Sequence, residues 1–124
     1  MSHTTIILAS SSQTRKDLMN RLGVVYECIS PQIDESPQCE LHADDLAKRL
    51  AFEKAKVISE QHPNAIVIGS DQVAWREGAP DIFIGKPLSV ENAIKQLQAN
   101  SDHFVYFSTA LSVQHQSTGF EQTI

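Results

Sequence analysis

The stretch Ile6-Ile7-Leu8-Ala9-Ser10-Ser11-Ser12-Gln13-Thr14-Arg15, followed by Lys16-Asp17-Leu18-Met19-Asn20-Arg21-Leu22-Gly23, predicts a buried strand, a tight serine loop and a helix that ends at glycine. A helix that begins behind small hydroxyl residues presents free backbone N–H groups and the positive end of its dipole. Arg15, in the first turn, adds a permanently charged, forked donor. The stretch therefore predicts a phosphate-binding site, although serine at such a junction is also a common N-cap that binds no ligand.

The rest of the chain alternates predicted strands and helices. The clearest helix covers residues 45–62, where apolar residues repeat at helical spacing and Pro63 ends the pattern. The run Ala65-Ile66-Val67-Ile68 is typical of a strand covered on both faces, and we expect it to end at Gly69-Ser70-Asp71-Gln72. The alternation predicts an α/β fold with a mixed, partly parallel sheet flanked by helices. Further predicted elements are strands at 24–29 and 105–113, a hairpin-like excursion over 73–84 and a helix from Ser89 to about Asn100.

Length and composition set the class of protein. The 124 residues suit one domain, residues 1–124, and a hydrophobic fraction of 41% is ordinary for a soluble globular protein. A net charge of -5 argues against a protein that coats nucleic acid or a membrane surface. With no apolar run long enough to span a membrane and no signal-peptide pattern, we expect a cytoplasmic location. The two cysteines, Cys28 and Cys39, have no zinc-site spacing.

The end of the chain contrasts with the strand before it. Residues 105–113 alternate apolar side chains with polar or small ones, which predicts a long, half-exposed strand. Residues 114–124 are polar and predict no helix to cover the apolar face of that strand. We therefore expect a domain that lacks its C-terminal part. Purified alone, such a chain is expected to associate through the uncovered face and to show weak or absent activity.

Several polar residues are candidates for a site at the carboxyl ends of the strands, where ligands bind in open α/β sheets. Asp71 can hold a divalent metal or act as a general base on water, although an Asx-turn is the simpler alternative. Glu35 follows Asp34 in a loop, where a solvated pair of carboxylates is the alternative. Lys54 lies between the apolar positions of its helix and points either to a ligand or, by snorkelling, to water. Lys86 lies between Gly85 and Pro87 in a predicted tight turn.

Together these residues form a coherent set for polyphosphate chemistry. Serine hydroxyls, backbone amides, Arg15, Lys54 and Lys86 can neutralise phosphate oxygens. Glu35 and Asp71 can hold magnesium or manganese, which prefer oxygen ligands and bridge phosphates. A metal in that place polarises the phosphoryl group and lowers the pKa of an attacking water. The chain contains neither GxxxxGK[ST] nor GxGxxG, so a P-loop and a Rossmann dinucleotide site are not predicted.

Five motifs occur in order and cover nearly the whole chain: Leu8-Ala9-Ser10-Ser11-Ser12-Gln13-Thr14-Arg15, Ile33-Asp34-Glu35, Leu50-Ala51-Phe52-Glu53-Lys54-Ala55, Ile68-Gly69-Ser70-Asp71-Gln72-Val73 and Gly85-Lys86-Pro87. Together they resemble the motifs of the Maf family, whose members are house-cleaning nucleotide pyrophosphatases with a fold similar to that of inosine triphosphate pyrophosphatase. The Ser-Asp-Gln form around Asp71 is similar to the YceF-type subgroup. Members of this subgroup hydrolyse 7-methyl-GTP to 7-methyl-GMP and pyrophosphate.

The resemblance implies a role for each candidate residue. It makes Asp71 the proton acceptor and puts Thr14 and Gln72 where the base is selected. It places Ser10, Arg15, Glu35, Lys54 and Lys86 around the triphosphate and a divalent cation, and it implies a homodimer. Two alternatives stay open: a dTTP/UTP pyrophosphatase of the same family, and an inactive nucleotide-binding fragment with a role in regulating cell division.

Overall fold

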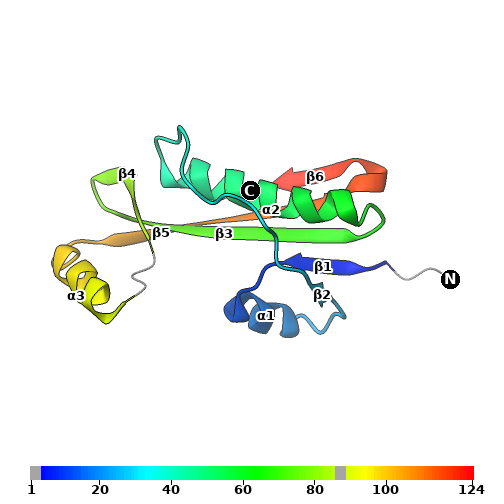
Figure 1. Ribbon diagram of the computed structural model, residues 1–124, viewed down its shortest axis with the longest axis horizontal. Coiled ribbons are helices and arrows are strands. Elements are labelled where there is room, and N and C mark those ends of the chain that lie inside the picture. Colours follow the sequence, from blue (N-terminus) through cyan, green and yellow to red (C-terminus); the bar gives the residue numbers. More distant parts are fainter. Residues whose placement is uncertain (1–3, 86–88) are drawn as a thin grey trace.

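A computed structural model describes residues 4–85 and 89–124, in which three α-helices accompany a six-stranded sheet (Figure 1). The sheet has the order β2-β1-β3-β5-β6, and β4 pairs with β3 outside this path. The pairs β1–β2 and β1–β3 are parallel, whereas β3 pairs antiparallel with both β4 and β5, and β5 with β6. The predicted α/β class with a mixed, partly parallel sheet is confirmed. The elements are β1 (Ile6–Ala9), α1 (Gln13–Asn20), β2 (Glu27–Cys28), α2 (Ala43–Gln61), β3 (Ile66–Arg76), β4 (Ala79–Ile84), α3 (Val90–Ala99), β5 (Val105–His115), the 3-10 turn η1 (Gln116–Thr118) and β6 (Phe120–Thr123).

Helix α2 organises the core. Its N-cap is His42, whose ring nitrogen Nδ1 accepts a hydrogen bond from the backbone N–H of Asp44 at 3.1 Å, and Asp44 and Asp45 lie in its first turn. The apolar stripe predicted for residues 45–62 is buried against β1, β3 and β5 in two clusters. The prediction for this helix is confirmed to within two residues at its start. The buried hydrophobic residues of the clusters are Ile7, Ala9, Ala43, Leu46, Ala47, Leu50, Ala51, Ala55, Ile58, Ala65, Val67, Val73 and Ala110.

Gly69 allows α2 to approach β3 closely. A Cβ atom at position 69 would lie 2.4 Å from the backbone oxygen of Ala51 and 2.7 Å from the backbone nitrogen of Ala55. These are backbone atoms of the helix, which cannot move aside as a flexible side chain can. A side chain at position 69 would therefore push α2 away from the sheet.

Two strands differ substantially from their predicted extent, and β5, predicted for residues 105–113, continues to His115. Strand β3 does not end at Gly69–Gln72 but continues to Arg76. The hairpin predicted over 73–84 is therefore formed by the last residues of β3 and by β4, which pair antiparallel. The strand predicted for 24–29 is reduced to Glu27–Cys28. The polar residues 70–72 suggested a turn, yet each of them has a partner in the fold: Ser70 bonds the backbone of Ala110, Asp71 bonds Lys54, and Gln72 bonds Thr109.

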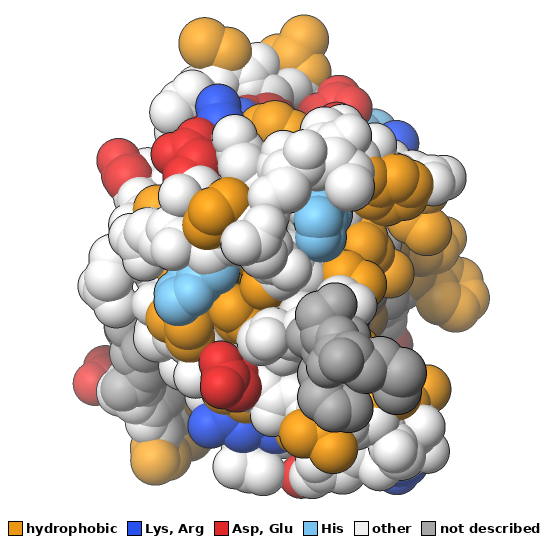
Figure 2. Space-filling view, turned by 90° about the vertical axis from the view of Figure 1, so that its right-hand side faces the viewer, with side chains coloured by type: hydrophobic (Ala, Val, Ile, Leu, Met, Phe, Trp, Pro, Cys, Tyr) orange, Lys and Arg blue, Asp and Glu red, His pale blue; other side chains and the backbone are white. Residues whose placement is uncertain are grey.

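The opposite side of the sheet is less covered. Along β5, the buried side chains at Ala110, Ser112 and Gln114 alternate with the exposed ones at Phe107 and Leu111. Helix α3 has no buried residue, although Ser89 caps it as predicted. Figure 2 shows hydrophobic side chains at the surface, gathered mainly on the right of that view. The exposure of Phe107 and Leu111 shows that the apolar face expected on residues 105–113 is largely exposed in the described chain. None of the described helices is both long enough and apolar enough to cross a membrane.

Candidate active site

An interruption in strand pairing marks one edge of β3. On this edge, β1 pairs with Ile66–Gly69 and β4 pairs with residues from Ala74 onward, while β5 pairs with Val67–Arg76 along the other edge. Among the described residues, positions 70–73 have no strand partner on the β1 side; we call this segment the β3 gap. It lies directly beyond the carboxyl end of β1, because Ala9 pairs with Gly69. Ligand sites of open α/β sheets lie at such strand ends.

A buried ion-paired cluster faces the β3 gap. Lys54 Nζ lies 2.8 Å from Asp71 Oδ1 and 2.7 Å from Glu35 Oε1. Lys54 and Asp71 are each 8% exposed, whereas Glu35 lies on an exposed loop. We call these three residues the Lys54 cluster. Charges buried to this degree occur almost only when they are paired. Lys54 and Asp71 therefore hold each other in fixed positions inside the protein.

The cluster decides between the alternatives that the sequence left open. Lys54 does not snorkel to water, because its amine is buried and shared by two carboxylates. Asp71 is not in an Asx-turn: it lies inside β3 with its side chain toward α2. Of the two loop carboxylates only Glu35 reaches the cluster. Asp34 instead accepts a hydrogen bond from the backbone N–H of Ser36 at 2.9 Å, and hydrogen bonding from Ser36 holds the pKa of Asp34 below its ordinary value.

The predicted serine loop and helix are present. Ser10 is buried, and its Oγ accepts a hydrogen bond from the backbone N–H of Ser12 at 3.0 Å. Ser12 is the N-cap of α1, and its Oγ accepts from the backbone N–H of Arg15 at 3.4 Å. The simple N-cap role of a serine is therefore realised at Ser12. Ser10, next to the carboxyl end of β1, adjoins the β3 gap.

Three other candidates lie toward the opposite side of the sheet. Adjacent residues of a strand point to opposite faces, so Gln72 points away from the side on which Asp71 meets α2. Gln72 is exposed, and its Nε2 donates to Thr109 Oγ1 at 3.1 Å. Helix α1, with the exposed Thr14 and the half-buried Arg15, lies across β1 from α2 (Figure 1). The structure therefore places candidates on both sides of the β3 gap. Lys86 lies outside the described residues.

Sequence reasoning missed Arg49, which holds the loop that bears Glu35. Its guanidinium donates to Glu40, to Glu53 Oε2 at 3.0 Å and to the backbone oxygen of Ser36 at 2.9 Å. A hydrogen bond from the backbone N–H of Gln38, and then the Arg49 contact, hold the pKa of Glu40 below its ordinary value of 4.5. The spacing of Arg49 and Glu53 predicts an ion pair within the helix. No sequence signal indicates that Arg49 also bonds Glu40 and Ser36 in the preceding loop.

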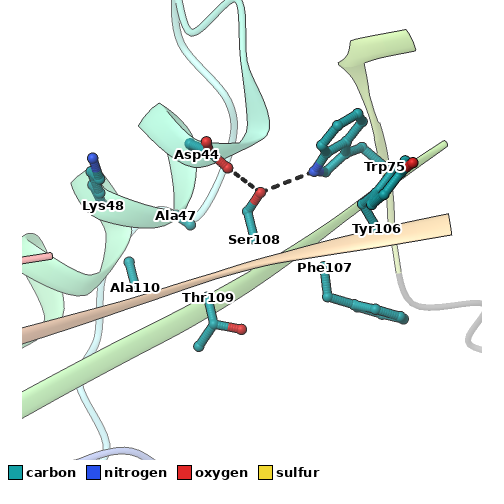
Figure 3. A pocket seen from close by; sticks show the side chains of 9 residues that line it. All are labelled: Asp44, Ala47, Lys48, Trp75, Tyr106, Phe107, Ser108, Thr109 and Ala110. Atoms are coloured by element: carbon teal, nitrogen blue, oxygen red, sulfur yellow. Dashed lines mark hydrogen bonds between the residues drawn. The ribbon is translucent and has the colours of Figure 1, made fainter. Parts of the chain in front are cut away.

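A separate hollow of ≈ 400 Å³ lies between α2 and β5, and it is not part of this site (Figure 3). None of the candidate residues that the structure describes lines it. In Figure 3, Ser108 bridges Asp44 and the indole nitrogen of Trp75, and the Trp75 and Tyr106 rings stack with centroids 4.7 Å apart. The hollow borders the outer edge of β5.

Two solved structures share the fold of this chain. A nucleoside-triphosphatase / dITP/XTP pyrophosphatase from Mycobacterium abscessus superposes with a TM-score of 0.57 at 18% identity, over 98% of this chain and 70% of that one. The Ham1 protein of Staphylococcus aureus gives 0.56 at 17% identity, over 97% and 67%. At these identities the likeness concerns the fold, and it confirms the predicted similarity to inosine triphosphate pyrophosphatase-like proteins.

Sequence comparison defines the family. The chain is 68% identical over 119 residues to a nucleoside triphosphate pyrophosphatase of Acinetobacter baylyi, and 43% identical over 118 residues to a 7-methyl-GTP pyrophosphatase of Pseudomonas savastanoi. These alignments cover 96% and 95% of this chain but 60% of each relative, so the chain spans about three fifths of the length of the curated relatives it matches. Residues 5–124 match the family model described as Maf-like protein. The chain belongs to the Maf family.

Proposed function

We propose that this chain binds a nucleoside triphosphate at the β3 gap and hydrolyses its α–β phosphate bond, with 7-methyl-GTP as the substrate and a divalent cation as cofactor. The observation that carries the proposal is the Lys54 cluster, a buried amine shared by two carboxylates beside the carboxyl end of β1. Most ion pairs that serve only structure lie on protein surfaces. The Lys54–Asp71 pair is instead buried, and it borders the β3 gap. Membership of the Maf family supports the same reaction.

Cationic and hydroxyl groups near the β3 gap suit a triphosphate. The α1 N-terminus offers backbone N–H groups and a positive dipole end, to which Arg15 adds a forked donor. Ser10 and Lys54 lie nearer to Asp71, and Lys86 is proposed as a further phosphate ligand from the family resemblance alone. These groups neutralise phosphate charge and do not distinguish one nucleobase from another.

The chemistry of the donor set fits magnesium or manganese. Glu35 and Asp71 both place an oxygen within 2.8 Å of one point, the Lys54 ammonium, so a positive charge is already stabilised between them. No group of three or more His, Cys, Asp or Glu side chains suited to a metal occurs among residues 4–85 and 89–124. Two carboxylates are nonetheless a usual protein contribution to magnesium, which takes its remaining ligands from substrate phosphates and water. When bound, such an ion polarises the phosphoryl group.

Asp71 is the proposed proton acceptor. Lys54 holds Oδ1 at 2.8 Å, so the carboxylate has a defined orientation and its second oxygen can accept a proton from water. The water oxygen then forms a bond to one phosphorus of the α–β bridge, and the bond from that phosphorus to the bridging oxygen breaks. The products are the nucleoside monophosphate and pyrophosphate, and the proton of the water stays on Asp71 until it is released to solvent.

Thr14 and Gln72 are the proposed base-selecting residues. Both are exposed on the side of the sheet away from the Lys54 cluster, so a nucleotide that crosses the β3 gap can reach them while its phosphates face Asp71. The choice of 7-methyl-GTP rests on the Ser-Asp-Gln motif and on relatives 42–45% identical that bear this activity in their names.

The test is pyrophosphate release from 7-methyl-GTP, GTP, dTTP and UTP with Mg²⁺, alongside calorimetric binding. We expect 7-methyl-GTP to be preferred and Asp71→Asn to lower turnover about 100-fold, the usual scale for a general base. The Asn variant should stay folded because Lys54 keeps Glu35 as a partner, and Asp81→Asn, an exposed position on β4, serves as control. Preference for dTTP or UTP would favour the other activity of the family. Tight binding without any release would make the chain a nucleotide-binding module.

A further inference from the structure

The loop that carries Glu35 has little support of its own. Residues 29–42, between β2 and α2, form neither a helix nor a strand, and none of these residues is buried. The Glu35 side chain is 60% exposed, and an exposed glutamate on such a loop is free to adopt many conformations. Its carboxylate nevertheless lies 2.7 Å from Lys54 Nζ. Ile33 packs against the core on one side of Glu35 along the chain, so a second restraint is needed on the other side.

Arg49 of α2 supplies this second restraint. Its Nη2 donates to the backbone oxygen of Ser36, the residue after Glu35, at 2.9 Å, and its Nε donates to Glu40 further along the loop. Its Nη1 donates to Glu53 Oε2, one turn along α2, at 3.0 Å. The planar guanidinium is thus fixed to the helix by one hydrogen bond and to the loop by two, an arrangement that the single ammonium of a lysine does not reproduce.

We propose that Arg49 is a positioning residue for Glu35: by holding the Ser36 carbonyl against α2, it keeps the Glu35 carboxylate at the Lys54 cluster. Arg49 and Lys54 both belong to α2, so one helix holds both the backbone beside Glu35 and the carboxylate itself. Helix α2 also packs on β3, which carries Asp71. Arg49 then acts on the divalent cation that the proposed function assigns to Glu35 and Asp71, so this role rests on that function.

Loss of Arg49 should weaken the binding of a cation. Without its hydrogen bonds the loop takes more conformations, and Glu35 lies at the Lys54 cluster for a smaller fraction of the time. The apparent dissociation constant of a ligand rises in inverse proportion to the fraction of the protein that is competent to bind it. A residue that only stabilised the fold would instead change the free energy of unfolding and leave the cation affinity of the folded chain unchanged.

Mn²⁺ binding to the whole chain, with no nucleotide present, tests this role through the electron paramagnetic resonance signal of the free ion. We expect Arg49→Gln to raise the dissociation constant about tenfold, which corresponds to a tenfold fall in the competent fraction. Arg49→Lys keeps the charge but not the fork, so it should lose most of the same affinity. Lys56→Gln, which removes an exposed charge from the same helix, is the matched control and should bind Mn²⁺ like the parent chain.

A double-mutant cycle separates the role of Arg49 from the proposed function. In a Glu35→Gln background, Arg49→Gln should cause no further loss of Mn²⁺ affinity, because its effect passes through Glu35. An equal loss in both backgrounds, or an Arg49→Lys variant that binds like the parent chain, would overturn the positioning role. Parental affinity in Arg49→Gln, with weakened binding in Glu35→Gln, would overturn that role alone. If Glu35→Gln itself leaves Mn²⁺ binding unchanged, the cation site of the proposed function fails and the role of Arg49 fails with it.

Amide hydrogen exchange tests the restraint on the loop with neither cation nor substrate present. The N–H groups of Ser36 and Gln38 donate to carboxylates of the same loop, at 2.9 and 2.7 Å. We expect both to exchange faster in Arg49→Gln than in the parent chain, with the exchange of α2 and β3 unchanged. Glu40 keeps the Gln38 N–H as a donor, so the variant should fold, which circular dichroism checks; if it does not, Arg49→Lys is used in the same measurements. Unchanged exchange of the two amides in a folded variant would show that Arg49 does not restrain the loop.

Discussion

Helices α2 and α1 both position candidate site residues, but the chain holds them in very different ways. Nine residues of α2 are buried, including Lys54 itself, whereas Met19 is the one buried residue of α1. Leu18, on α1, is 54% exposed. The Lys54 amine and the Asp71 carboxylate therefore belong to the packed interior beneath α2, while Arg15 lies on a helix with little tertiary support. Substitutions at positions that pack against α2 should lower stability and activity together. Substitutions on the exposed face of α1 should lower nucleotide affinity alone.

The largest effect is expected from Gly69→Ala, which attacks the packing of α2. The new methyl group would meet the backbone of Ala51 and Ala55 at 2.4 and 2.7 Å, so the helix must move. We expect a loss of about 3 kcal/mol in the free energy of unfolding, at the upper end for overpacking, measured by urea denaturation. Activity should fall with it, because the shift separates Lys54 from Asp71.

Gly85→Ala is the control for this substitution. A Cβ at position 85 would meet no atom of residues 4–85 and 89–124 within 4 Å, and the backbone there does not require glycine. We expect the unfolding free energy of this variant to stay within about 0.5 kcal/mol of the parent chain. Equal stability of the Gly69 and Gly85 variants would show that α2 can retreat from β3 at little cost, and that the site is not fixed by this contact.

An intermediate effect is expected from Arg15→Lys on α1. Lysine keeps the charge but lacks the fork that binds phosphate with two parallel hydrogen bonds. Calorimetry should show affinity reduced about tenfold for every nucleoside triphosphate alike, because phosphate contacts do not distinguish bases, with unchanged thermal stability. Arg21→Lys, at the exposed C-terminal end of α1, should change neither. A loss confined to one base would instead place Arg15 beside the base.

The contrast between the two helices also explains what the sequence could predict. The stripe of α2 and its stop at Pro63 are local signals, so its boundaries follow from the sequence. The partners of Lys54 do not, because Asp71 is 17 residues away and its orientation depends on β3 passing straight through residues 70–72. Polar residues suggested a turn there. They tolerate a strand only because α2 and β5 supply their hydrogen-bond partners, and this information appears only in the folded chain.

The smallest effect is expected from Glu40→Gln, which tests the loop that α2 holds through Arg49. The pKa of Glu40 is lowered in the folded chain, so its ionised form contributes stability above the ordinary value of 4.5, and this contribution is lost as pH falls through the lower folded value. Glutamine has no such titration. The variant should therefore have a slightly lower Tm than the parent chain at neutral pH, and the difference should shrink in acid. Glu60→Gln, whose carboxylate lies 3.9 Å from Lys56 at the exposed end of α2, should show no such pH-dependent difference. A Tm difference for Glu40→Gln that persists unchanged in acid would mean that the Arg49 contact stabilises the loop by packing rather than by charge.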